Sequence, residues 1–96
     1  MDAKIENELY LRLLEDFGIE KQTLMLAEEQ GVLIKSINKR LRGKTDTQAE
    51  IIEEMADVHI MMNQVRKFFG ITVKDVAEEM DRKLERIQDR LNRGEL

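Results

Sequence analysis

The chain has 96 residues, of which 38% are charged and 42% hydrophobic, and its net charge is −4. It has no cysteine, which excludes disulfides and thiolate metal sites, and its net negative charge argues against a general binder of polymeric nucleic acid, which needs a basic face. No apolar run approaches the roughly 20 residues of a membrane span, and the charged N-terminus does not resemble a signal peptide, so we expect a cytoplasmic protein that does not bind membranes.

The first two predicted helices each end at a glycine. The absence of proline and the small number of aromatic residues favour an all-helical chain. The spacing predicts a helix from about Ala3 to Asp16, before Gly18, with apolar residues on one face at Ile5, Leu9, Leu13 and Phe17. A second helix is predicted from about Ile19 to Arg42, before Gly43, with apolar residues at Leu26, Leu33, Ile37 and Leu41.

The next two predicted helices each begin with the pattern of a capping box. Thr47 with Glu50, and Thr72 with Asp75, have the spacing at which a hydroxyl and a carboxylate each accept from a free backbone N–H. The third helix ends at Gly70 and carries a predicted core stripe of Ile51, Met55, Val58, Met62, Val65 and Phe69. The fourth is lined by Val73, Val76, Met80, Leu84, Ile87 and Leu91.

The whole chain, residues 1–96, is therefore predicted to be one domain, an all-α four-helix bundle without linker or internal repeat. A helical layer this thin exposes more apolar surface than one copy can cover. We expect a homo-oligomer, either a homodimer or a homotetramer, in which a second copy completes the core.

Acidic residues of the third predicted helix share one face. Glu50, Glu54 and Asp57 follow each other at spacings of four and three residues, beside the apolar stripe. The second helix offers Glu28 and Glu29, and acids from two antiparallel helices can hold a hard divalent cation between them. Composition and periodicity alone favour the alternative of a solvated face with salt bridges.

Three segments resemble a known family. They are Glu28-Glu29-Gln30-Gly31-Val32-Leu33, then residues 38–44 with their basic side chains, and then Glu50-Ile51-Ile52-Glu53-Glu54-Met55-Ala56-Asp57-Val58. In this order they are similar to the core of the MazG-like nucleoside triphosphate pyrophosphohydrolases, whose motifs read Glu-Glu-x-Gly-Glu-Leu and Glu-x-x-Glu-Glu-x-Ala-Asp-Val. The similarity runs from Lys21 to Val65, about half of the chain.

The resemblance implies a MazG-like bundle that hydrolyses a nucleoside triphosphate to the monophosphate and pyrophosphate, with Mg²⁺ or alternatively Mn²⁺. Glu29, Glu54 and Asp57 match the family's catalytic metal ligands, and Glu50 lies on the same face as a further ligand. Val32 stands where the family has a glutamate, so we expect weakened metal binding and impaired hydrolysis. The alternative function is a catalytically silent helical module that binds nucleotides or mediates oligomerisation.

Basic residues at two places are candidates for contact with substrate phosphates. Lys39, Arg42 and Lys44 gather where the second helix ends, and Lys83 lies on the fourth helix. The alternatives are that the first three complement the helix macrodipole and that Lys83 belongs to a solvated face. His59, the single histidine, lies on the side of its helix away from Asp57, so we do not expect it to be a ligand or a base.

Overall fold

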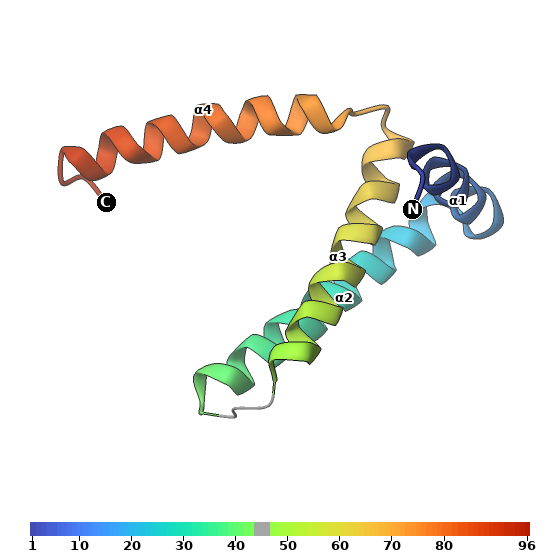
Figure 1. Ribbon diagram of the computed structural model, residues 1–96, viewed down its shortest axis with the longest axis horizontal. Helices are drawn as coiled ribbons and strands as arrows, with labels where there is room; N and C mark the ends of the chain where they lie inside the picture. Colours follow the sequence, from blue (N-terminus) through green and yellow to red (C-terminus); the bar gives the residue numbers. More distant parts are fainter. Residues whose placement is uncertain (44–46) are drawn as a thin grey trace.

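The computed structural model describes residues 1–43 and 47–96, and over these residues it contains four α-helices and no strand. They are α1 (Ala3–Phe17), α2 (Ile19–Leu41), α3 (Gln48–Phe68) and α4 (Val73–Asn92) (Figure 1). The all-helical prediction is confirmed, and the first two helices end within one residue of their predicted limits. In the described part of the chain, none of the helices combines the length and apolar character needed to cross a membrane.

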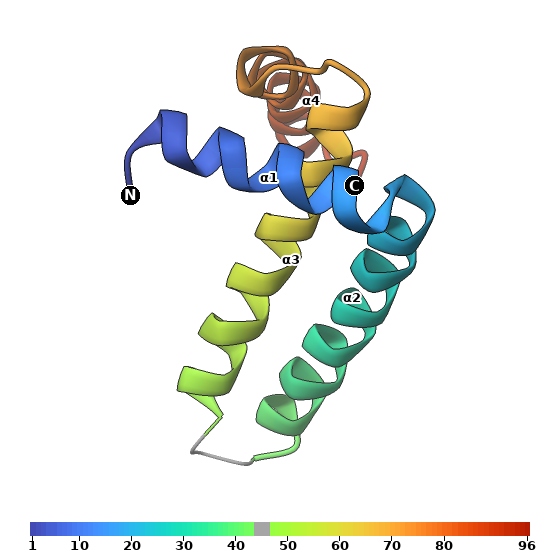
Figure 2. The same cartoon turned by 90° about the vertical axis from the view of Figure 1, so that its right-hand side faces the viewer.

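Helices α2 and α3 form an antiparallel pair, and α1 crosses one end of it. Figures 1 and 2 show α2 and α3 side by side along their lengths, with α1 over the end where α2 begins and α3 finishes. Among the described residues only Tyr10 and Val58 are buried apolar side chains, whereas the buried polar ones are Gln22, Ser36, Thr47, Glu54 and Gln64. The centre of this body is therefore unusually polar.

Tyr10 attaches α1 to α3. Its hydroxyl donates to Glu6 Oε1 at 2.9 Å and accepts from Asn63 Nδ2 at 3.2 Å. Burial raises the pKa of Tyr10, so the phenol stays protonated at neutral pH and keeps both bonds. The bond with Glu6 orients the Tyr10 hydroxyl within α1, and the bond with Asn63 joins α1 to α3.

Two glutamine side chains are enclosed within the three-helix body without full hydrogen bonding. Gln22 is 2% exposed and Gln64 0%, and the Oε1 atom of each has no hydrogen-bond partner. A buried acceptor without a partner costs stability, because it loses its hydrogen bonds to water. We therefore expect Gln64→Met, which keeps the side chain unbranched, to raise the free energy of unfolding by about 1 kcal/mol.

Urea denaturation followed by circular dichroism measures this change. The control is Gln30→Met, at an exposed position of α2, which should shift the unfolding free energy by less than about 0.5 kcal/mol. A Gln64→Met protein no more stable than the parent would show that the amide oxygen is satisfied in solution.

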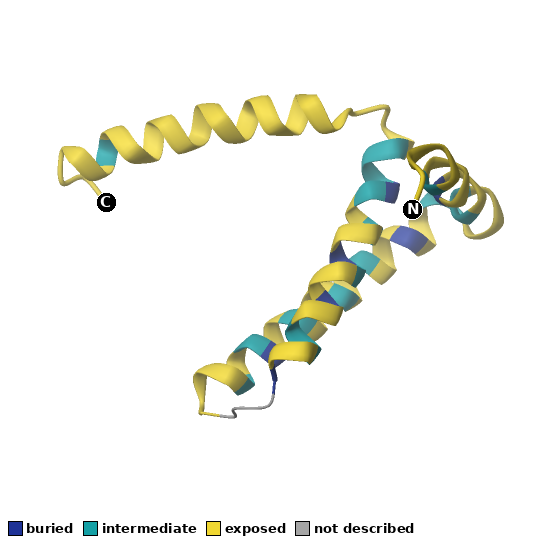
Figure 3. Ribbon diagram, in the orientation of Figure 1, coloured by how far each residue is buried: buried dark blue, intermediate teal, exposed yellow. Residues whose placement is uncertain are grey.

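Helix α4 projects away from the other three helices. No residue of α4 has its Cα within 8 Å of α1, α2 or α3 in the described structure, and its side chains are almost all exposed (Figure 3). The radius of gyration is 16.7 Å, whereas a compact chain of this length has about 12.5 Å. The prediction of a four-helix bundle is therefore wrong for the single chain, which forms a three-helix body with a projecting helix.

The apolar stripes predicted on α3 and α4 are therefore largely exposed to solvent. On α3 the core stripe is buried at Val58, but Met55, Met62 and Phe69 are 46%, 49% and 63% exposed. The whole stripe of α4 is exposed. The periodicity groups these residues on one face of each helix, but within the same chain the α3 face is covered only in part and the α4 face is not covered.

Local hydrogen bonds determine the direction in which α4 leaves α3. Gly70 has a φ of 67°, which reverses the chain, and Arg66 both donates from Nη1 to the Ile71 carbonyl at 2.8 Å and accepts from the Ile71 amide at 3.0 Å. The predicted capping box of Thr72 and Asp75 is confirmed, with bonds of 3.0 and 2.9 Å. Because these contacts lie within the connection itself, the start of α4 is defined without help from other helices.

The capping box predicted at Thr47 and Glu50 is wrong. Thr47 has helical backbone angles, φ −99° and ψ −2°, and its side chain makes no capping hydrogen bond to α3. A cap residue needs an extended backbone to direct its oxygen toward the first free N–H groups. Glu50 pairs instead with Lys39 of α2.

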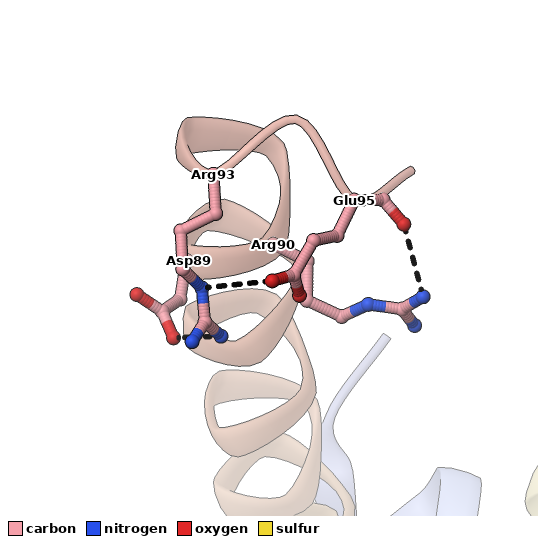
Figure 4. A network of polar contacts seen from close by, with 4 residues as sticks. All are labelled: Asp89, Arg90, Arg93 and Glu95. Carbon is pink, nitrogen blue, oxygen red and sulfur yellow. Dashed lines mark hydrogen bonds and ion pairs between the residues drawn. The ribbon is translucent and has the colours of Figure 1, made fainter.

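Charged side chains also close the far end of α4 (Figure 4). Arg93 Nη2 lies 2.6 Å from Asp89 Oδ2, its Nε lies 3.8 Å from Glu95 Oε1, and Arg90 Nη2 donates to the Glu95 carbonyl at 3.2 Å. Exposed pairs of this kind stabilise a helix by only about 0.3–0.5 kcal/mol each. They hold the helix end but do not replace tertiary packing.

Candidate functional site

An ion pair shows the register between α2 and α3. Lys39 Nζ lies 3.6 Å from Glu50 Oε1. Counting seven residues back along α2 reaches Val32, and seven forward along α3 reaches Asp57, a displacement of about 10 Å on each antiparallel helix. Val32 is therefore level with Asp57 across the helix pair, and 41% of its surface is exposed at the edge of the interface.

Glu54 is a buried carboxylate on the α2-facing side of α3. Only 8% of its surface is exposed, and its Oε2 atom has no hydrogen-bond partner. Removing a carboxylate oxygen from water without a partner is costly. This buried oxygen makes Glu54 a candidate ligand for a cation.

Glu29 faces the same place from α2. Partial burial raises the pKa of its carboxyl above the ordinary 4.5, and the neighbouring charges of Asp57, Glu28 and Glu54 raise it further. These interactions show that the acids selected from the sequence on two separate helices lie near one another. The concentration of like charge is unfavourable unless a proton or a cation neutralises it.

The same carboxylates do not form a finished metal cage. Across the described residues, no three or more acidic or histidine side chains are grouped so that they could hold a metal ion. The donors themselves fit Mg²⁺, which prefers carboxylate oxygens and retains several waters. Side-chain rotation of Glu29, Glu54 and Asp57 would therefore have to accompany binding, whereas Glu50 is held by Lys39 two turns away from Asp57.

The candidate phosphate-binding residues do not gather around these acids. Lys39 is paired with Glu50, Arg42 is exposed at the C-cap of α2, and Lys44 lies outside the described residues. Lys83 is exposed on α4, which does not approach α2 or α3 of its own chain. His59 is exposed, as its position on the helix predicts.

A buried serine on the same side of α2 as Glu29 was not identified from the sequence. Ser36 is only 2% exposed and lies seven residues after Glu29, so both point toward α3. The signal was present, because a small polar residue occupies an inward position of α2 at helical spacing from a candidate ligand. Its hydroxyl adds a neutral oxygen to the same interface.

No protein-family model, curated protein or solved structure matches this chain. The functional interpretation of the site therefore depends on its chemistry. Two antiparallel helices supply carboxylates to one side of their interface, and one of the oxygens is buried without a partner.

The raised pKa of Glu29 predicts how stability depends on pH. In metal-free protein the folded state holds this proton more tightly than the unfolded state, so stability is full below pH 4.5 and falls as pH rises through the raised pKa. Glu29→Gln removes that loss, so we expect a higher Tm than the parent at pH 7 and an equal Tm below pH 4.5.

Thermal melts between pH 4 and 8 in the presence of a chelator test this prediction. The control is Glu8→Gln, an exposed acid of α1 that removes the same charge away from the cluster. If Glu29→Gln and Glu8→Gln change the Tm equally at every pH, the neighbouring acids have no effect on the Glu29 carboxyl.

Proposed function

We propose that the chain is a MazG-like, Mg²⁺-dependent pyrophosphohydrolase that converts a nucleoside triphosphate to the monophosphate and pyrophosphate, and that its activity is impaired. The observation that carries the proposal is the buried Glu54 oxygen without a partner, close to Glu29 and Asp57. The three motif segments support it independently, because they place the same acids at the positions that bind metal in the family.

In this proposal the residues of the chain position the metal ion and orient the triphosphate. Glu54 supplies a desolvated oxygen whose direction is fixed by packing, and Glu29 and Asp57 supply oxygens from the two sides of the interface. Bound Mg²⁺ would neutralise the triphosphate and lower the barrier to attack by water on the α-phosphorus. No covalent nucleophile is required, which agrees with a chain that has no cysteine and an exposed histidine.

The alternative is a catalytically silent nucleotide-binding or oligomerisation module. Two observations favour it: Val32 occupies an expected ligand position, and no group of three acids in the described chain is ready to hold a metal. Under this alternative Glu29, Glu54 and Asp57 bind no metal, and the repulsion between their charges only lowers stability.

Metal binding and hydrolysis together distinguish the two functions. We expect Mg²⁺ or Mn²⁺ to raise the Tm of the parent and Asp57→Asn to remove most of that rise, because the amide keeps the shape of the side chain but not its charge. The control Asp81→Asn, on α4, should retain the full metal effect. Pyrophosphate release from a panel of canonical and modified triphosphates should be weak for the parent and lower for Asp57→Asn.

A parent protein whose Tm ignores both metals, and which releases no pyrophosphate from any triphosphate, would support the silent module. Equal metal responses of the Asp57→Asn and Asp81→Asn proteins would place any bound ion elsewhere.

The proposal includes a homo-oligomer, either a homodimer or a homotetramer. Its support is the small core of the single chain, in which only Tyr10 and Val58 are buried apolar residues among those described.

A further inference from the structure

Helix α4 carries a continuous apolar face that nothing in its own chain covers. We define the α4 stripe as its six exposed large apolar residues, which are Val73, Val76, Met80, Leu84, Ile87 and Leu91, with 42% to 64% of their surfaces exposed. They recur at three- and four-residue spacing and share one side of the helix. Most of the stability of a helix in a protein comes from packing of its apolar face, so this face needs a partner.

Helix α3 carries a second uncovered face. We define the α3 stripe as Ile52, Met55, Met62 and Phe69, with 59%, 46%, 49% and 63% of their surfaces exposed. These residues lie on one side of α3, next to the buried Val58. Met55, Met62 and Phe69 are spaced by seven residues, as are Met80 and Ile87 on α4, so the two stripes have matching repeats.

The α4 stripe does not reach the α3 stripe of its own chain. The hydrogen bonds between Arg66 and Ile71 and the capping box at Thr72 direct α4 outward from the end of α3 (Figure 1). We propose that α4 of one copy packs antiparallel on the α3 stripe of a second copy, and that the second copy's α4 packs on the first in return. The result is a two-fold symmetric dimer with exchanged α4 helices.

The exposed area of the single chain fits this arrangement. The accessible surface is 7711 Å², about 2,000 Å² more than a compact protein of this mass exposes. A stable dimer buries about 800 Å² on each partner. Contact between the two α4 helices alone would leave both α3 stripes uncovered, whereas reciprocal exchange engages the α3 and α4 faces of both copies.

Charge favours the antiparallel orientation. From Gln48 to Asp57, α3 has four acids and no basic residue, and its C-terminal end carries Arg66 and Lys67. On α4, residues 74–81 have a net charge of −3 and residues 82–92 a net charge of +2. Only the antiparallel orientation places the acidic half of each helix beside the basic half of the other.

Cysteine pairing tests the contact, because the natural chain has no cysteine. Chains carrying Met62→Cys are mixed with differently tagged chains carrying Met80→Cys, Leu84→Cys or Ile87→Cys, unfolded, refolded together and oxidised. We expect disulfides between the two tagged chains, with one α4 position preferred. When Met55→Cys replaces Met62→Cys, the preferred position should move toward the C-terminus of α4.

Light scattering tests the assembly with matched variants. The parent should have at least twice the 11.3 kDa mass of the chain at micromolar concentration. Leu84→Asp and Met62→Asp should each reduce the measured mass to that of a monomer. The monomer should keep a helical circular dichroism spectrum, because α1 to α3 stay folded. Leu24→Asp is the control, because Leu24 is 72% exposed on α2 outside both stripes, and should leave the mass unchanged.

Four results would overturn the proposal. The first is a monomeric parent. The second is loss of the dimer in Leu84→Asp but not in Met62→Asp, which would indicate that α4 pairs with α4. The third is movement of the preferred cysteine toward the N-terminus of α4, which would indicate parallel packing. The fourth comes from a single chain that carries both Met62→Cys and Leu84→Cys: a disulfide within that chain, without disulfides between mixed chains, would mean that α4 folds back. Cross-linking does not depend on whether the aspartate variants fold.

Discussion

Val32→Glu is expected to increase Mg²⁺-dependent pyrophosphate release by about 100-fold, the size of effect that correct positioning of a substrate can supply. The register shown by Lys39 and Glu50 places position 32 level with Asp57 across the helix pair. A glutamate there would add an anionic oxygen ligand at the exposed edge of the site. With valine at this position, water would have to supply that ligand. The triphosphate would then be held by a cation with a more rigid set of ligands.

The control for this substitution is Ile34→Glu. Ile34 is two residues further along α2, 59% exposed, and on a different side of the helix, so it adds the same charge away from the acids. In metal-free protein Val32→Glu should lower the Tm more than Ile34→Glu does, because it increases repulsion near Glu29 and Asp57. Equal activity of the Val32→Glu and Ile34→Glu proteins on every triphosphate would place position 32 outside the site.

The helices were predictable because their signals are local. Gly18 and the Thr72–Asp75 box act on backbone groups within a few residues, so the sequence specifies where those helices end and begin. Thr47 has the same spacing to Glu50, but its backbone is helical, so its side chain does not cap α3, and Glu50 lies beside Lys39 of α2. The spacing alone does not specify the backbone angles that a cap needs.

The position of α4 was not predictable in the same way. Periodicity states that Met80, Leu84 and Ile87 share a face, but not which neighbour covers that face. The backbone bond from Ile71 to Arg66 belongs to the helix end that Gly70 signals, but the bond from Arg66 Nη1 to the Ile71 carbonyl, which also orients the start of α4, is marked by no short motif.

For the site, helical spacing puts Glu54 and Asp57 on one side of α3, and the charges of both residues raise the pKa of Glu29 on α2. Helical spacing did not predict that Glu54 is buried, because its burial depends on how closely α2 and α3 pack. Nor did it predict the buried Gln22, Ser36 and Gln64, because a polar residue at an inward position is normally taken as exposed.

Glu54→Gln is expected to have opposite effects on activity and on stability. In the Val32→Glu background it should lower pyrophosphate release by about 100- to 1000-fold, because it removes a preorganised charge from the place where the transition state is stabilised. In metal-free protein with the natural Val32 it should raise the free energy of unfolding by about 1 kcal/mol, because a buried carboxylate oxygen without a partner becomes part of a neutral amide.

Glu53→Gln is the matched control, since Glu53 is adjacent, exposed and on another side of α3. It should change neither the rate nor the stability appreciably. Chemical denaturation with and without Mg²⁺, together with a pyrophosphate assay, measures both effects on the same preparations. A purely structural Glu54 would lose stability and activity together, and a remnant carboxylate would gain stability without any loss of metal response. Only a residue whose buried charge is reserved for a cation gains stability without metal and loses the Mg²⁺-dependent rise in Tm.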